Sequence, residues 1–187
     1  MINLELPKTL TVDGIERPID ADFRNIIKIN IALVDEKISN TEKGIILLNR
    51  MYGIDEKGNS NYLKFKNKQE AINQALWFID WGKEYKEEKK PKLTDWEQDF
   101  NMICSAVNKV IKTEVRDFDF LHWWTFLGYL SERSECLYST VTQIREKLAN
   151  NEKLDKFDKK VIRENRELIF IKDENSIEFE AELFGSD

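Results

Sequence analysis

The sequence is poor in glycine, proline and cysteine. Seven Gly and three Pro in 187 residues are too few for the many tight turns of an all-β fold. Two cysteines, Cys104 and Cys136, do not make the disulfide framework of a small secreted domain. We interpret them as free thiols at packed positions, in a protein of a reducing compartment.

Long apolar runs are absent as well. No stretch approaches the ~20 apolar residues of a membrane-spanning helix, and residues 1–6 lack the pattern of a signal peptide. We therefore expect a cytosolic protein that does not associate with membranes. The formal net charge is -6, with 35 acidic against 29 basic residues. This balance disfavours sequence-independent nucleic-acid binding, which needs clustered Lys and Arg.

Motifs for chemistry are also missing. The sequence has no glycine-rich phosphate loop, no Gly-x-Ser-x-Gly elbow and no His/Cys spacing typical of a metal site. The acidic groups at Asp117 and Asp119 and at Glu178–Glu182 do not match a calcium loop, so we interpret them as solvated charge. We predict no cofactor, no metal and no enzymatic activity. The alternative is a small intracellular enzyme that uses the single histidine, His122, with a cysteine such as Cys104.

The residues that are present indicate a mainly α protein. Apolar residues make up 41% and aromatic residues 11% of the chain, a globular composition. An Asp13-Gly14 turn between short apolar segments predicts a small N-terminal β-hairpin. Behind it, apolar residues at helical spacing predict a bundle of about six or seven helices. Their predicted starts are Asp20 or Asp22, Asn40, Asn67, Thr94 (in a Thr94–Glu97 capping box), Asp117 or Asp119, Ser134 and Asp155.

The length fits a single helical domain over residues 1–187. A highly charged stretch at residues 83–92 is predicted to be an exposed linker and to mark a sub-boundary. Residues 173–187 form an acidic tail, in which Ile177 to Phe184 alternate apolar and acidic side chains. This period-two pattern fits a strand, or a segment that orders when it meets a partner.

The five tryptophans are the most informative residues. Trp123 and Trp124 are adjacent, so on a helix they point about 100° apart. Both are buried only if that helix is covered on two sides, which favours a central helix. Trp81, beside the charged stretch, fits a core position and a contact surface equally well. Phe179 and Phe184 of the tail are further candidates for binding a partner.

The segment Asp117–Leu130 contains Leu-His-Trp-Trp-Thr-Phe, in which His122, Trp123, Trp124 and Phe126 are the distinctive residues. It resembles the Leu-His-Trp-Trp-x-Phe segment of the phage proteins named for gene product fifteen of siphophages that infect Gram-positive bacteria. The Asp22-Phe23-Arg24 step into the first helix, the acidic helix start near residues 95–99 and the Ile144-Arg145 pair are also similar. The likeness runs from Leu10 to about Phe170, and the acidic tail lies outside it.

This resemblance implies a role in tail morphogenesis. Proteins of the family are encoded between the major tail protein and the tape measure protein, a position that implies a tail assembly chaperone. The expected partner is the tape measure protein, together with a sister chaperone or further copies of the chain. The expected location is the cytoplasm of the infected or lysogenic host, with the protein absent from the mature virion. The alternative is a structural tail completion or connector protein that stays in the particle.

Overall fold

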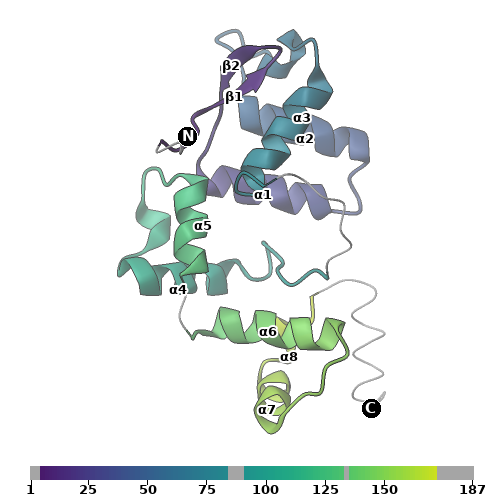
Figure 1. Ribbon diagram of the computed structural model, residues 1–187, viewed down its shortest axis with the longest axis vertical. Helices are drawn as coiled ribbons and strands as arrows, with labels where there is room; N and C mark the ends of the chain where they lie inside the picture. Colours follow the sequence, from purple (N-terminus) through teal and green to yellow (C-terminus); the bar gives the residue numbers. More distant parts are fainter. Residues whose placement is uncertain (1–4, 84–90, 133–134, 172–187) are drawn as a thin grey trace. The chain divides into compact units, whose positions relative to one another are not determined.

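A computed structural model describes residues 5–83, 91–132 and 135–171 (Figure 1). As predicted, the fold is mainly α with an N-terminal hairpin. These described residues contain eight α-helices, two short 3-10 helices and two strands. The elements are β1 (Thr9–Val12), β2 (Ile15–Pro18), α1 (Phe23–Val34), α2 (Asn40–Tyr52), η1 (Asn61–Lys64), α3 (Lys68–Ile79), α4 (Phe100–Ile111), η2 (Val115–Asp117), α5 (Trp123–Ser131), α6 (Leu137–Ala149), α7 (Lys156–Glu164) and α8 (Arg166–Ile169).

The predicted hairpin is confirmed. β1 and β2 pair antiparallel, with Thr9 opposite Pro18. Asp13 and Gly14 both have positive φ angles, 56° and 72°. That combination is the type I′ turn, whose twist matches the twist of the two strands.

The turn also holds the start of α3. The Asp13 carboxylate accepts hydrogen bonds from the backbone N–H groups of Lys66 and Asn67, at 2.8 and 2.9 Å. The Asp13 N–H donates to Glu70 at 3.0 Å. One turn residue therefore satisfies free N–H groups at a helix start more than fifty positions along the chain.

The chain divides into two compact units. Unit 1 comprises residues 1–88 and 117–131, and unit 2 comprises residues 89–116 and 132–187. Each unit is thus built from two separate stretches of sequence. The prediction of one domain with a sub-boundary at residues 83–92 stays a prediction, and residues 84–90 and 173–187 lie outside the described part.

In unit 1, α2 packs between α1 and α3, β1 packs on α3, and α5 packs on α1. The largest fully buried side chains of these elements come from all four α-helices of the unit: Phe23, Ile26, Ile29, Leu47, Met51, Phe78, Trp123 and Phe126. Apolar residues at helical spacing supply this core, as the sequence pattern requires.

In unit 2, α6 lies against α4 and α8, and α7 lies against α8. Its core is an apolar cluster formed by α6, α7, α8 and the residues just after α8: Val141, Ile144, Val161, Ile162, Ile169 and Phe170. None of the helices in the described ranges is both long and apolar enough to cross a membrane.

Several predicted helix starts are correct. Asp22 and Asn67 cap α1 and α3 through their side chains. α2 begins at Asn40, but the cap is Ser39, which forms a capping box with Glu42. Gly53, with φ 67°, is the residue at which α2 ends.

The capping box predicted at Thr94 is wrong. The Thr94 hydroxyl bonds the Tyr138 hydroxyl at 2.8 Å, and the N–H of Glu97 donates to Asp95. α4 begins only at Phe100. The Thr94 hydroxyl therefore bonds a residue distant in sequence, Tyr138, and does not cap a helix.

One further start also differs. α5 begins at Trp123, after His122, and neither Asp117 nor Asp119 caps it. The start predicted at Asp155 is correct, since Asp155 caps α7 through its side chain, but the helix is interrupted at Asn165, which separates α7 from α8. Ser134, predicted to cap α6, lies outside the described residues, and the N-cap position of α6 is held by Cys136.

Candidate functional site

His122 occupies the position before the first turn of α5. Its Nδ1 accepts the N–H of Trp124 at 3.1 Å, and its carbonyl accepts the N–H of Phe126 at 3.0 Å. The ring therefore caps the helix in the way an Asp or Ser side chain would. Its other nitrogen, Nε2, lies 2.9 Å from the carbonyl oxygen of Pro7.

These two partners fix the tautomer of the ring. A backbone N–H can only donate and a carbonyl can only accept, so Nδ1 is unprotonated and Nε2 carries the hydrogen. Burial of the ring lowers the pKa of His122, and the charge of Lys8 lowers it further. His122 is consequently a neutral ring with both nitrogens engaged, an arrangement that suits positioning and not proton transfer.

The two neighbouring tryptophans bind the end of α3. The indole N–H of Trp123 donates to the carbonyl of Ile79, and that of Trp124 donates to the carbonyl of Phe78, both at 2.8 Å. The last carbonyls of a helix lack intrahelical partners. Adjacent indoles on α5 thus satisfy consecutive carbonyls at the C-terminus of α3.

The aromatic rings continue on both sides of this contact. Trp123 stacks on Phe126, which stacks on Phe23 of α1 with a centroid distance of 4.6 Å. Trp124 stacks on Phe78 and meets Trp77 edge to face. Trp123 is buried and Trp124 half-buried. We call His122, Trp123, Trp124, Trp77 and Phe78 the aromatic clamp.

α3 ends in a Schellman motif that carries Trp81. The N–H of Gly82 donates to the carbonyl of Trp77, and that of Trp81 donates to the carbonyl of Phe78. Trp81 therefore sits at the left-handed position of the motif, with φ 57°, and is 40% exposed. Glycine is the usual residue there, because a side chain makes this conformation unfavourable.

The Asp22-Phe23-Arg24 segment contacts the aromatic clamp through its backbone. Asp22 and His122 form an isolated antiparallel bridge. Arg24 forms an ion pair with Asp22 at 2.8 Å and donates to the carbonyls of Phe118 and Asp119 at 2.8 and 2.7 Å. Two segments that share the family resemblance, about a hundred residues apart, are thus joined in unit 1.

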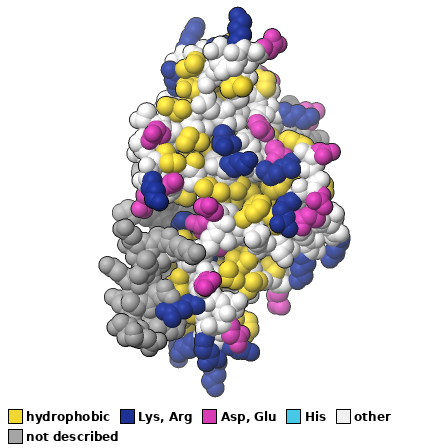
Figure 2. Space-filling model, turned by 180° about the vertical axis from the view of Figure 1, so that it is seen from behind, with side chains coloured by type: hydrophobic (Ala, Val, Ile, Leu, Met, Phe, Trp, Pro, Cys, Tyr) yellow, Lys and Arg dark blue, Asp and Glu magenta, His cyan; other side chains and the backbone are white. Residues whose placement is uncertain are grey.

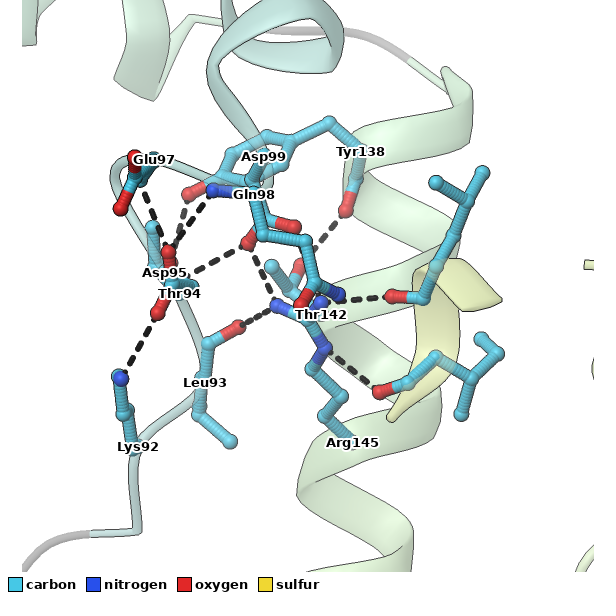
Figure 3. A network of polar contacts seen from close by, with 12 residues as sticks. Lys92, Leu93, Thr94, Asp95, Glu97, Gln98, Asp99, Tyr138, Thr142 and Arg145 are labelled. Atoms are coloured by element: carbon cyan, nitrogen blue, oxygen red, sulfur yellow. Dashed lines mark hydrogen bonds and ion pairs between the residues drawn. The ribbon is translucent and has the colours of Figure 1, made fainter. Parts of the chain in front are cut away.

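Unit 2 contains a buried ion pair (Figure 3). Asp99 is 0% and Arg145 5% exposed. The two guanidinium NH₂ nitrogens of Arg145 donate to the two carboxylate oxygens of Asp99, at 2.6 and 2.9 Å. The Asp99 carboxylate also accepts the N–H of Asp95 at 2.9 Å.

The remaining donors of Arg145 go to backbone carbonyls. Nε donates to Ile169, one NH₂ nitrogen also donates to Leu93, and the other to Leu168, at 2.9, 2.9 and 2.6 Å. All five N–H groups of the guanidinium therefore have acceptors. The network ties the segment before α4, α6 and the end of α8 together, as Figure 3 shows for the labelled residues. It offers no free group for chemistry.

A pocket of about 220 Å³ opens beside this network and is lined by Leu93, Thr94, Tyr138, Ser139, Thr142, Gln143 and Glu146. None of these lining residues is a histidine, cysteine or lysine. Hydroxyl and amide groups can bind a polar group there, but the pocket has no activated nucleophile.

The Cys104 thiol is not activated for reaction either. Burial raises the pKa of the Cys104 thiol to about 11, so it is protonated and unreactive at neutral pH. In the part of the chain that the structure describes, no cluster of three or more His, Cys, Asp or Glu side chains could hold a metal ion. Phe179 and Phe184 lie outside the described residues.

Sequence reasoning singled out His122, Trp123, Trp124 and Phe126 but missed what they contact. It did not identify Asp99 as a buried partner of Arg145, although both positions lie in segments named for the resemblance. A charged residue in an otherwise apolar stripe of α6 is the signal that could have indicated a buried ion pair.

Comparison with known proteins identifies one protein family that matches this sequence. Searches of curated proteins and of solved structures return no significant match. A family model described as "Bacteriophage Gp15 protein" matches residues 2–170. That match spans both units and contains the aromatic clamp and the Asp99–Arg145 pair, so the chain belongs to the bacteriophage Gp15 protein family.

Proposed function

We propose that this protein is a non-catalytic tail assembly chaperone that binds the tape measure protein during tail morphogenesis. The observation that carries the proposal is the family match over residues 2–170, which indicates a phage structural or assembly protein. The finer role follows from the tail-cluster position that the resemblance implies. A chaperone of this kind acts in the host cytoplasm and leaves before the particle is complete.

The surface of unit 1 supports a binding role. Three large apolar side chains are exposed close in sequence to members of the aromatic clamp: Leu6 at 43%, Trp81 at 40% and Phe120 at 57%. Leu6 precedes Pro7, whose carbonyl holds His122, and Phe120 lies two residues before His122. Two of the three, Trp81 and Phe120, are aromatic, and aromatic residues are enriched in protein interfaces.

Trp81 is the strongest candidate anchor. Its backbone is held in a left-handed conformation that costs a bulky residue roughly 1–2 kcal/mol. With 40% of the residue exposed, part of the indole is available to contact a partner. Strain at an exposed aromatic residue is expected where binding, and not folding, uses the side chain. An amphipathic helix of the client is the type of ligand that such an apolar surface accepts.

The test is co-expression with the neighbouring tape measure protein, followed by pull-down, a solubility assay and analysis of mature particles. A soluble complex whose chaperone is missing from particles is the expected result. If the protein is retained in particles and leaves the tape measure protein insoluble, a structural completion or connector role replaces the proposal.

A variant pair locates the contact surface. Trp81→Gly is expected to weaken capture of the tape measure protein at least several-fold with a smaller change in stability, because relief of the left-handed conformation offsets part of the lost burial. Leu63→Ala is the control, since Leu63 is 60% exposed but lies in η1, which contacts α2. Equal capture by both variants would remove Trp81 from the proposed interface.

A further inference from the structure

The outer face of α7 is unusually basic for an acidic protein. Among the exposed residues of this helix, four are basic and one, Glu164, is acidic. Lys156, Lys159, Lys160 and Arg163 recur at the i, i+3, i+4 and i+7 positions that share one face of a helix. We call these four residues the basic stripe. In Figure 2 the Lys and Arg side chains gather at the lower end of the molecule, where Figure 1 places α7.

The opposite face explains the orientation of the stripe. Asp158, Val161 and Ile162 are buried in unit 2, so the stripe must face solvent. Within the stripe, Lys160 forms an ion pair with Glu164 at 3.9 Å, between side chains that are 62% and 53% exposed. Such a pair neutralises little of the stripe, because water screens it.

An exposed aromatic residue borders the stripe. Phe157 is 61% exposed, among the most exposed large apolar side chains of the described residues. It lies one position after Lys156, at the edge of the basic face. A ligand that matched this surface would combine negative charge with apolar side chains.

The chain itself contains such a segment. Between Ile177 and Phe184, three glutamates alternate with apolar residues, and the stretch contains no basic residue. In an extended chain Glu178 and Glu182 are up to ~13 Å apart. Lys156 and Arg163 are about 10 Å apart along the helix axis. The charges of the two segments are therefore opposite in sign and similar in spacing.

The connection is long enough. Ile171, the last described residue of the segment after α8, is buried in unit 2, and α8 packs on α7. The six residues 172–177 can span up to ~20 Å, more than the ~13 Å length of α7. We propose that the acidic segment Ile177–Phe184 docks within its own chain on the basic stripe and Phe157 of α7.

Docking of this kind is reversible and sensitive to salt. Each exposed ion pair is individually weak, and screening shortens from about 8 Å at physiological ionic strength to about 3 Å in 1 M salt. A partner with a similar acidic and apolar segment would compete for the same face. The inference does not depend on the proposed chaperone role, because it concerns contacts within one chain.

The test is carbodiimide cross-linking of the full chain, which joins carboxylates to lysine amines that are in contact. Lys159 is the reporter amine, and the ion pair of Lys64 with Asp55, at 2.7 Å, is the internal reference. We expect cross-links from Glu178, Glu180 or Glu182 to Lys159. Substitution K156Q/K160Q/R163Q should reduce them at least about fivefold, as should 1 M NaCl.

The control is K37Q/K57Q/K68Q, which removes the same charge at exposed lysines of unit 1. It should leave the Lys159 cross-links unchanged. Equal loss in both variants would overturn the proposal. A mixture of ¹⁵N-labelled and unlabelled protein separates contacts within one chain from contacts between chains. Cross-links predominantly between labelled and unlabelled chains would also overturn it.

A second measurement does not depend on the folding of the α7 variant. In E178Q/E180Q/E182Q, acetylation of Lys159 by a soluble reagent should rise several-fold relative to Lys37. If this variant instead leaves Lys159 unchanged, the tail does not cover the stripe. Protection of Lys159 by added RNA or DNA, with no effect of the tail substitutions, would assign the stripe to nucleic acid and overturn the proposal.

Discussion

His122 is a neutral ring in the folded protein, because burial and the nearby Lys8 lower its pKa below 6.5. The unfolded chain takes up a proton near pH 6.5, which the folded protein resists. The free energy of unfolding therefore has a contribution that is fully present above this pH and is lost as the pH falls below it. A histidine acting as a helix cap thus makes the fold sensitive to mild acid.

His122→Asn tests this dependence. Asparagine can still cap α5, but it removes the titration, the bond to Pro7 and the contact with Phe78. We expect a loss of ~1–3 kcal/mol at pH 7.5 and a smaller further loss between pH 7.5 and 5.5 than in the wild type. Urea unfolding at both pH values measures this, and identical pH slopes would contradict the assignment.

Arg145 is a buried cation that forms an ion pair with Asp99 in unit 2. Replacing it with Met leaves the Asp99 carboxylate buried without its ion-pair partner, at a cost of ~3–5 kcal/mol. The double variant D99L/R145M should recover part of this loss, since no charge is then left uncompensated. Chemical denaturation of the two variants measures the difference.

Arg163→Met is the control for this substitution, because Arg163 is exposed. It should change stability by less than about 0.5 kcal/mol. A double variant that is no more stable than R145M would show that the pair is held by its carbonyl contacts and not by charge compensation.

At the scale of elements, three kinds of interaction determine where α3 ends. The Schellman motif closes the backbone, the two indole N–H groups bind its carbonyls, and Gly82 leaves room for the rings. A Cβ at Gly82 would lie 3.0 Å from Cη2 of Trp124 and 3.3 Å from Cζ2 of Trp77, and the φ angle there is +75°. The helix end and the clamp are therefore one packing arrangement.

Gly82→Ala should destabilise the protein by ~1–3 kcal/mol, since it combines overpacking with an unfavourable φ. Gly44→Ala is the matched control with the opposite sign. Gly44 lies inside α2, and a Cβ there meets only Ile72 at an ordinary 3.7 Å. It should stabilise the protein by roughly 0.5–1 kcal/mol. Thermal melting measures the stability change in both variants. Equal changes in G82A and G44A would contradict the packing argument.

At the scale of the whole molecule, unit 1 depends on a segment far along the chain. α5 contributes Trp123, Phe126 and Leu130, all buried, to a unit whose other described elements end at Ile79. Burial of such side chains contributes ~1.5–3 kcal/mol each. Residues 1–88 alone should therefore lack several kcal/mol of the stability of the unit.

A fragment of residues 1–88 is expected to melt at a markedly lower temperature than the full chain. A peptide of residues 117–131 should raise that temperature in a concentration-dependent way. The same peptide carrying W123A and F126A is the control and should have little effect. If the fragment is fully stable alone, α5 is not an integral part of unit 1.

The sequence by itself determined part of the local structure. The Asp13-Gly14 turn, the caps at Asp22 and Asn67 and the helix end at Gly53 follow from interactions among residues a few positions apart. Helical spacing of apolar residues predicted the class of the fold for the same reason. The motif around His122 also indicated the family without any structure.

Only the tertiary structure decided which distant groups meet. Thr94 bonds Tyr138 in place of a local cap, and Asp99 reaches Arg145 across 46 positions. The same holds for the indole N–H groups of Trp123 and Trp124, which find carbonyls at the end of α3. Local signals carry no information on such partners, because a buried polar group takes whichever complementary group the packing brings within about 3 Å.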